Sequence, residues 1–175
     1  MTRTALLSAL EDHRREFTAR FDALPTEIVH ARPSPKAWSL AQIADHIVRI
    51  DAELMLEGPP ASRAARATSG VRGLVLNVGL SLPIRIPTPP GVPSIQPSAD
   101  ADWADVRERW AAVRAPWMRT TPDLEAVAFP HPYFGPLVWA DALAFLLAHH
   151  RHHNAQIRRT LDGVRSSSTS RPDGV

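Results

Sequence analysis

The sequence contains no cysteine, and this absence excludes several kinds of site at once. Without a thiol the chain can form no disulfide, supply no thiolate ligand to a metal and offer no cysteine nucleophile. A metal site in this protein would have to be built from other side chains, and histidine and the carboxylates are the ones available.

The sequence is also poor in net charge and in long hydrophobic runs. Its 20 basic and 18 acidic residues leave a formal net charge of only +2. Basic runs interleaved with aromatic residues do not occur, so we expect no nucleic-acid partner. The mostly apolar segment between Arg72 and Arg85 is well short of the roughly 20 residues that a membrane-spanning helix needs. Because the N-terminus also shows no signal-peptide pattern, we expect a cytoplasmic protein with no membrane partner.

Length and composition indicate one globular domain. A chain of 175 residues with 44% hydrophobic residues can bury a sizeable core. We expect this domain to cover residues 1–162 and the last helix to end near Gly163. The remainder, residues 163–175, is rich in serine and is expected to be a disordered C-terminal tail.

Apolar residues at three- and four-residue spacing predict four amphipathic helices. These helices are expected at residues 3–23, 39–57, 98–115 and 137–161. Ser39 and Gln42 form a capping-box pattern at the start of the second helix. Ser98 is the expected N-cap of the third helix. The segment before the last helix, which includes His131 and Gly135, is expected to be a loop.

The segment 58–98 holds eight of the 17 prolines and predicts a long connection between the second and third helices. Within it, Val71–Ile86 fits either a short helix or an extended run, and we expect a helix to about residue 81 followed by an extended crossover. The fold class predicted from these features is all-α, a four-helix bundle with a long crossover connection.

Three histidines lie on the apolar faces of two of these helices. His46 falls on the stripe of Ile43 and Ile50, where on its own it could be a hydrogen-bonded core residue. His149 and His153 are four residues apart, so their side chains stack on one face of the last helix. A third imidazole from a facing helix would complete a three-nitrogen site with open coordination positions, which is typical of a catalytic metal.

Helical spacing alone does not choose between two pairs of ligands on the last helix. The pair His149/His153 is spaced i, i+4, and the pair His150/His153 is spaced i, i+3. His152 points away from this face, and we expect it to be dispensable for metal binding, together with His30 and His13.

Other polar residues have two interpretations each. Gln156 could orient a ligand or a bound water, or simply lie at the edge of the stripe. His131 could reach the mouth of the site or contact only the end of the bundle. Asp45 and Asp51 are expected on solvated faces rather than as a general base, so the catalytic residues stay unknown.

Two stretches of the chain resemble motifs of the DinB-like (DinB/YfiT-type) superfamily. One is His131-Pro-Tyr-Phe-Gly followed by the pattern H-x-x-x-H-x-x-Q-I from His149 to Ile157. The other is the pattern W-S, six residues, then H, which ends at His46. The resemblance implies a four-helix bundle and one divalent metal ion bound by His46, His149 and His153. Zinc or nickel is the expected metal, with iron or manganese as further candidates.

One departure from the family pattern bears on this ligand set. Relatives often carry an acidic residue after the first histidine of the pair, where this chain has His150. An alternative ligand therefore lies next to His149.

The resemblance also implies a class of activity. Characterised DinB-like enzymes include transferases and isomerases that use a low-molecular-weight thiol such as bacillithiol or mycothiol. We therefore expect a metal-dependent enzyme of detoxification or stress response, a thiol-S-transferase acting on a small-molecule substrate. The alternative is a non-catalytic metal-binding or partner-binding bundle. Exposed apolar helix faces would further allow a homodimer.

Overall fold

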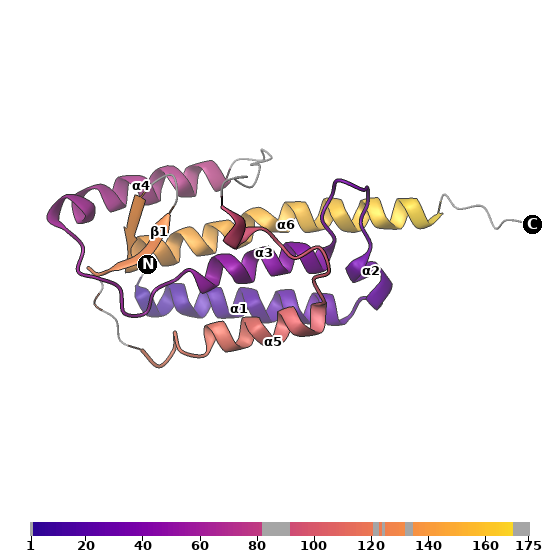
Figure 1. Cartoon of the computed structure of the whole chain (residues 1–175), viewed down its shortest axis with the longest axis horizontal. Coiled ribbons are helices and arrows are strands. Elements are labelled where there is room, and N and C mark those ends of the chain that lie inside the picture. The colour runs from indigo at the N-terminus through magenta and orange to yellow at the C-terminus, as the bar shows by residue number, and fades with distance from the viewer. Residues whose placement is uncertain (1, 82–91, 121–122, 124, 132–134, 170–175) are drawn as a thin grey trace, which may run out of the picture.

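The computed structural model describes residues 2–81, 92–120, 123, 125–131 and 135–169. The bundle helices lie side by side (Figure 1). They are α1 (Arg3–Asp22), α3 (Leu40–Ala52), α5 (Trp103–Arg114) and α6 (Trp139–Thr169). Helices α1 and α6 run in one direction, and α3 and α5 run in the other (Figure 1). The predicted four-helix bundle is confirmed. Among the described residues, none of the helices combines the length and the apolar character that a membrane span requires.

A long crossover joins α3 to α5, as predicted, because two parallel helices require the chain to return along the bundle. The connection contains α4 (Arg63–Ser81) and a short 3-10 helix, η1 (Pro93–Ile95). Helix α4 packs against α6 at one end of the bundle (Figure 1). It ends where the sequence predicted but begins eight residues before Val71. The predicted extended run falls largely on residues 82–91, which lie outside the described residues.

The start of α3 is confirmed in atomic detail. The backbone N–H of Gln42 donates to the Ser39 hydroxyl at 3.2 Å, and the Ser39 N–H donates to the Gln42 side chain at 3.1 Å. The predicted end near residue 57 is wrong, because the helix ends at Ala52. The following residues pair with the hairpin instead, where the Met55 N–H donates to the carbonyl of Ala128 at 2.8 Å.

The predicted Ser98 cap of α5 is also wrong. Asp102 caps this helix, and its carboxylate accepts the N–H groups of Ala104 at 2.8 Å and Asp105 at 3.3 Å. Ser98 is already engaged elsewhere, since its backbone N–H donates to the Asp45 carboxylate at 2.7 Å. The connection before α3 holds a further short helix that the sequence did not predict, α2 (Thr26–His30).

The expected loop before α6 is in part a β-hairpin. Strand β1 (Val127–His131) pairs with β2 (Gly135–Val138) in an antiparallel sheet, and Phe129 lies opposite Leu137. The apolar side chains of both residues are buried in the core. The hairpin therefore closes one end of the bundle with apolar side chains. The local sequence, which is rich in proline and histidine, did not indicate strands here.

The last helix is longer than predicted. It continues through Gly163 to Thr169, so the expected disordered tail is helical over residues 163–169, while residues 170–175 lie outside the described part. Gly163 is required by packing rather than as a helix end, because a Cβ atom there would lie 2.7 Å from the Cβ of Pro33. The next residue, Val164, is buried and extends the apolar face of the helix.

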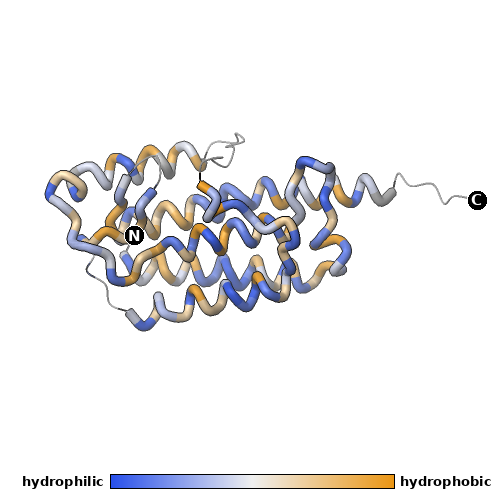
Figure 2. The backbone as a smooth tube through the Cα atoms, in the orientation of Figure 1, coloured by the Kyte–Doolittle hydropathy of each residue, from blue (hydrophilic) through white to orange (hydrophobic). Residues whose placement is uncertain are grey.

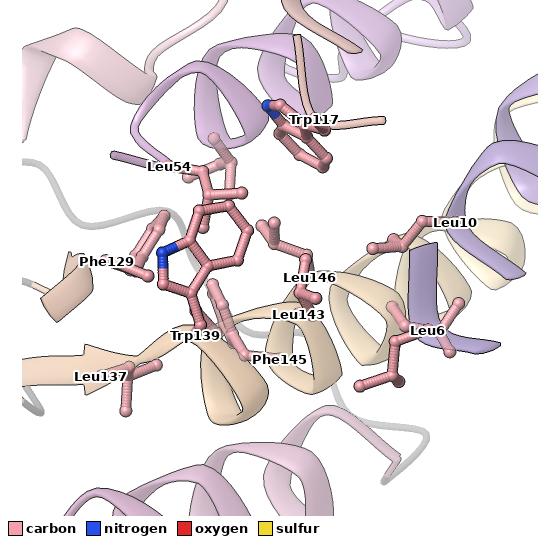
Figure 3. Close-up of a cluster of buried hydrophobic side chains, with 14 of the residues drawn as sticks. Leu6, Leu10, Leu54, Trp117, Phe129, Leu137, Trp139, Leu143, Phe145 and Leu146 are labelled. Atoms are coloured by element: carbon pink, nitrogen blue, oxygen red, sulfur yellow. The ribbon is translucent and has the colours of Figure 1, made fainter. Parts of the chain in front are cut away.

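Two clusters of buried apolar side chains form the core. The first lies at the hairpin end, where the Trp139 ring is surrounded by Leu54, Phe129 and Leu143 (Figure 3). The second lies further along the bundle and includes Phe21, Ile43, Ile47, Trp110 and Ile157. Apolar stretches recur along the bundle helices and along α4 (Figure 2). On α6, the segment between Leu146 of the first cluster and Ile157 of the second carries the histidines.

Candidate metal centre

The structure brings His46, His149 and His153 together between the two apolar clusters. Each side chain can offer one ring nitrogen, and these three nitrogens lie within 4.8 Å of one another. The ring centroid of His46 lies 5.3 Å from that of His149 and 5.1 Å from that of His153. The ring centroids of His149 and His153 are 4.5 Å apart. The three residues are only 4%, 7% and 6% exposed.

Local helix geometry explains this convergence. His149 and His153 are separated by one turn of α6, which places both rings on the face turned towards the core. His46 faces them from α3, which runs antiparallel to α6 (Figure 1). The predicted arrangement, two histidines from one helix and one from its neighbour, is what the structure shows.

Hydrogen bonds orient two of the three rings. The Nδ1 of His46 lies 2.6 Å from the carbonyl oxygen of Ile95, and the Nδ1 of His153 lies 2.7 Å from Oε1 of Gln156. A carbonyl oxygen accepts, so both Nδ1 atoms carry the proton and donate. Each ring is thereby left with a lone pair on Nε2, the tautomer that a metal ligand needs. Gln156 thus orients a histidine of the cluster.

The ring of His149 faces the ring of His153 directly. The Nε2 of His149 lies 3.0 Å from the Nε2 of His153, and the buried Nδ1 of His149 has no partner among the described residues. Two nitrogens at this separation are near the spacing of ligands that share one ion at about 2.0–2.1 Å. The donor set therefore fits a divalent metal ion.

Burial sets the protonation of this cluster. Loss of hydration lowers the pKa of His149 and His153 well below 6.5, and the neighbouring imidazoles lower it further. Burial also lowers the pKa of His46, although the hydrogen bond to Ile95 opposes this effect. The three rings are consequently neutral at pH 7, and neutral imidazole is the form that binds metal.

His150, the alternative ligand, is turned away from this cluster. Its Nε2 lies 2.9 Å from Oδ1 of Asp51, and its ring centroid lies 6.4 Å from that of His149. The three-histidine group that could hold a metal does not include it. Of the two pairs that helical spacing allowed, the structure brings His149 and His153 to His46.

The expectation that Asp45 and Asp51 lie on solvated faces is wrong. Both are fully buried. Asp45 accepts the guanidinium N–H groups of Arg49, at 2.9 Å, and of Arg109. The sequence did carry a signal for Asp51, which lies four residues after Ile47 and therefore on the apolar stripe of α3.

His131 and His152 lie near the centre but do not belong to it. The ring of His131 lies 5.3 Å from that of Phe145, which in turn stacks on His149 at 5.8 Å. His131 is therefore separated from the cluster by Phe145. The Nδ1–H of His152 donates to the carbonyl oxygen of Leu80 at 3.0 Å.

Comparison with known protein families agrees with this architecture. A family model of the DinB superfamily matches residues 9–157. The chain belongs to the DinB superfamily. The matched range of this DinB-superfamily protein includes the hairpin and all three histidines of the candidate centre. A search of curated proteins found no match.

Proposed function

We propose that this DinB-superfamily protein binds one divalent metal ion through His46, His149 and His153 and uses it in catalysis. The observation that carries the proposal is the meeting of three buried imidazoles whose nitrogens lie within 4.8 Å of one another. Three protein ligands leave positions open for water or a substrate, and a metal so bound supplies Lewis acidity and lowers the pKa of its ligand.

Zinc or nickel is the proposed ion, with iron or manganese as further candidates, because imidazole suits all of these metals. Metal analysis of the purified protein tests this directly. Each of the variants His46→Ala, His149→Ala and His153→Ala should lose most of the bound metal. His30→Ala is the matched control, since His30 lies outside the cluster. Its ring is hydrogen-bonded to the carbonyl oxygen of Thr26 and to the backbone N–H of Trp103. Full metal occupancy in His46→Ala would contradict the three-ligand site.

The proposed reaction class is thiol transfer to a small-molecule electrophile, in detoxification or a stress response. Family-level analogy supports this class, and low-molecular-weight thiols such as bacillithiol or mycothiol are the cosubstrates it suggests. The chain has no cysteine of its own, so the sulfur would come from the cosubstrate. Within the site, the rings of Trp38, 5.2 Å from His46, and of Phe145, beside His149, would keep water from the reacting atoms.

Cobalt substitution tests the thiol proposal. The visible spectrum of the cobalt-loaded protein should gain a thiolate charge-transfer band when a small thiol is added. Glycerol or a thioether of the same size serves as the control. If no thiol at millimolar concentration changes the spectrum, the thiol-transfer proposal fails while the metal site stands.

A metal that only stabilises the bundle is the second candidate, and the low exposure of the three histidines favours it. Chelation distinguishes the two. In a preformed catalytic site, removing the ion should lower the melting temperature but leave the helical circular dichroism nearly unchanged, because the two apolar clusters hold the helices. Loss of the helical signal on chelation would indicate that the metal forms the fold and would favour the structural role.

A further inference from the structure

A buried polar cluster lies next to the three histidines and links three helices. At its centre is the carboxylate of Asp51 on α3. It accepts the indole N–H of Trp110 at 2.7 Å and two guanidinium N–H groups of Arg114, at 3.0 and 2.8 Å, all from α5. It also accepts from Nε2 of His150 on α6 at 2.9 Å. All four residues are at most 5% exposed.

The contact between Asp51 and His150 joins the two helices that carry the candidate ligands. Asp51 follows His46 by five residues on α3, and His150 directly follows His149 on α6. His46 contacts His149 and His153, whereas Asp51 contacts His150, whose side chain points about 100° around α6 from that of His149. Two such contacts along a helix pair define both the rotation of one helix and its shift along the other.

The orientation of His150 depends on this hydrogen bond. The Nε2 is the atom that faces Asp51, and the buried Nδ1 has no partner among the described residues. A carboxylate only accepts, so Nε2 carries a proton and donates to it. Asp51 is also paired with Arg114, so loss of the histidine would leave the carboxylate with its counter-ion.

A second cluster of the same type provides an internal comparison. Asp22 on α1 accepts the indole N–H of Trp103 at 2.8 Å and the guanidinium of Arg107 at 3.1 Å. Trp103 and Arg107 are spaced like Trp110 and Arg114 and precede them by seven residues on α5. The side chain of Asp22 is 37% exposed, and both of these partners are on α5. Full burial of the carboxylate and contact with α6 through a histidine distinguish the Asp51 cluster.

We propose that Asp51 and His150 are positioning residues of the metal centre, and that their hydrogen bond holds α6 in the rotation that turns His149 and His153 towards His46. This inference rests on the proposed metal binding. It assigns to His150 a role other than that of a ligand, and it explains why a carboxylate is buried on the helix that carries His46.

The test compares three substitutions of His150 in the full chain by titration with cobalt. His150→Leu removes the donor and keeps the Asp51–Arg114 pair. We expect it to fold and to bind cobalt about tenfold more weakly, with a changed visible spectrum, as loss of an orienting contact around a metal site does. His150→Gln should bind within about twofold of the native protein, because the Gln amide nitrogen can take the place of Nε2 and donate to Asp51.

Asp22→Asn is the control for a purely structural role. It weakens a cluster with the same kinds of donor, so it should lower the melting temperature without changing cobalt affinity or the spectrum. If His150→Leu does not fold, His150→Asn repeats the test, because its amide is too short to reach the Nε2 position.

The outcomes separate the inference from the proposed function. If the native protein binds no metal, both are overturned. If it binds cobalt, and His150→Leu binds with unchanged affinity and spectrum, the positioning role is overturned and the metal site stands. If His150→Gln binds cobalt as weakly as His150→Leu, His150 is a ligand and the positioning role is overturned.

Discussion

The Nδ1 atom of His153 lies 2.7 Å from Oε1 of Gln156, one turn further along α6. This contact is local to the helix, and it sets which nitrogen of His153 is available to a metal. His46 is oriented in the same way by the backbone carbonyl of Ile95, which no side-chain substitution removes. Gln156 is therefore the position at which the orientation of a proposed ligand can be tested.

Gln156→Leu should lower metal affinity by about 10- to 100-fold, because the His153 ring loses the acceptor that fixes its tautomer. Gln156→Glu keeps an oxygen acceptor at the same place and should retain most of the affinity. Isothermal titration with zinc or nickel measures both variants. Equal affinities of Gln156→Leu and the native protein would show that this hydrogen bond does not support the site.

Trp110→Ala should destabilise the fold by about 3–5 kcal/mol, because a fully buried ring is replaced by a cavity. The substitution also removes the T-shaped contact with Phe17, at 5.4 Å, and the indole N–H that Asp51 accepts. Denaturant unfolding measures the loss. Met118→Ala, at a side chain that is 61% exposed, should stay within about 0.5 kcal/mol of the native protein. A neutral Trp110→Ala would contradict the packing of α5 on the core.

Gly58→Ala should destabilise the contact between the crossover and the hairpin by more than about 1 kcal/mol. A Cβ atom at residue 58 would lie 1.6 Å from the carbonyl oxygen of Val127, so the backbone would have to move. Gly70→Ala is the matched control, because no atom lies within 4 Å of a Cβ there and the residue is inside α4. This control should gain about 0.5–1 kcal/mol. Thermal unfolding of the two variants should therefore shift in opposite directions.

The free energy of unfolding should fall as the pH decreases from about 6.5 to about 4. Burial lowers the pKa of His13 and of His131 to about 4, whereas the unfolded chain takes up these protons near pH 6.5. Between these values the unfolded state binds more protons than the folded state, so acid favours unfolding. Urea unfolding of the metal-free protein at pH 7, 5.5 and 4.5 measures the loss. His131→Phe should flatten this dependence, and an unchanged slope would contradict the assignment.

The expected homodimer remains a prediction, and α4 is the surface on which to test it. Its outer face exposes Val71, Leu74, Val75 and Val78 by 51–65%, at the i, i+3, i+4, i+7 spacing by which two helices interlock. Leu74→Glu should convert a dimer into a monomer in light scattering. Met118→Glu, on the comparably exposed Met118, should leave the oligomeric state unchanged. A dimer that survives Leu74→Glu would have to use another surface.

Local periodicity was sufficient for the bundle helices and for placing His46, His149 and His153 on interior faces, whereas the choice of His149 over His150 came from the family resemblance. The Ser39–Gln42 capping box depends on residues three apart, and the His149–His153 pair depends on one helical turn. The apolar stripe of α3 placed His46 in the interior. These features are decided by neighbours in the chain, so the sequence alone determined them.

Contacts between distant residues decided the features that the sequence left open or predicted wrongly. His150 differs from His149 in facing Asp51, 99 residues away, and this partner is brought close only by the packing of α3 on α6. Gly163 lies inside α6, where Pro33 packs too close for a Cβ atom, although glycine often ends a helix. Asp51 is buried because charged and polar donors from α5 and α6 compensate its charge, and burial without them would be costly. Tertiary structure supplied these partners, since no local pattern records which distant group will satisfy a buried polar atom.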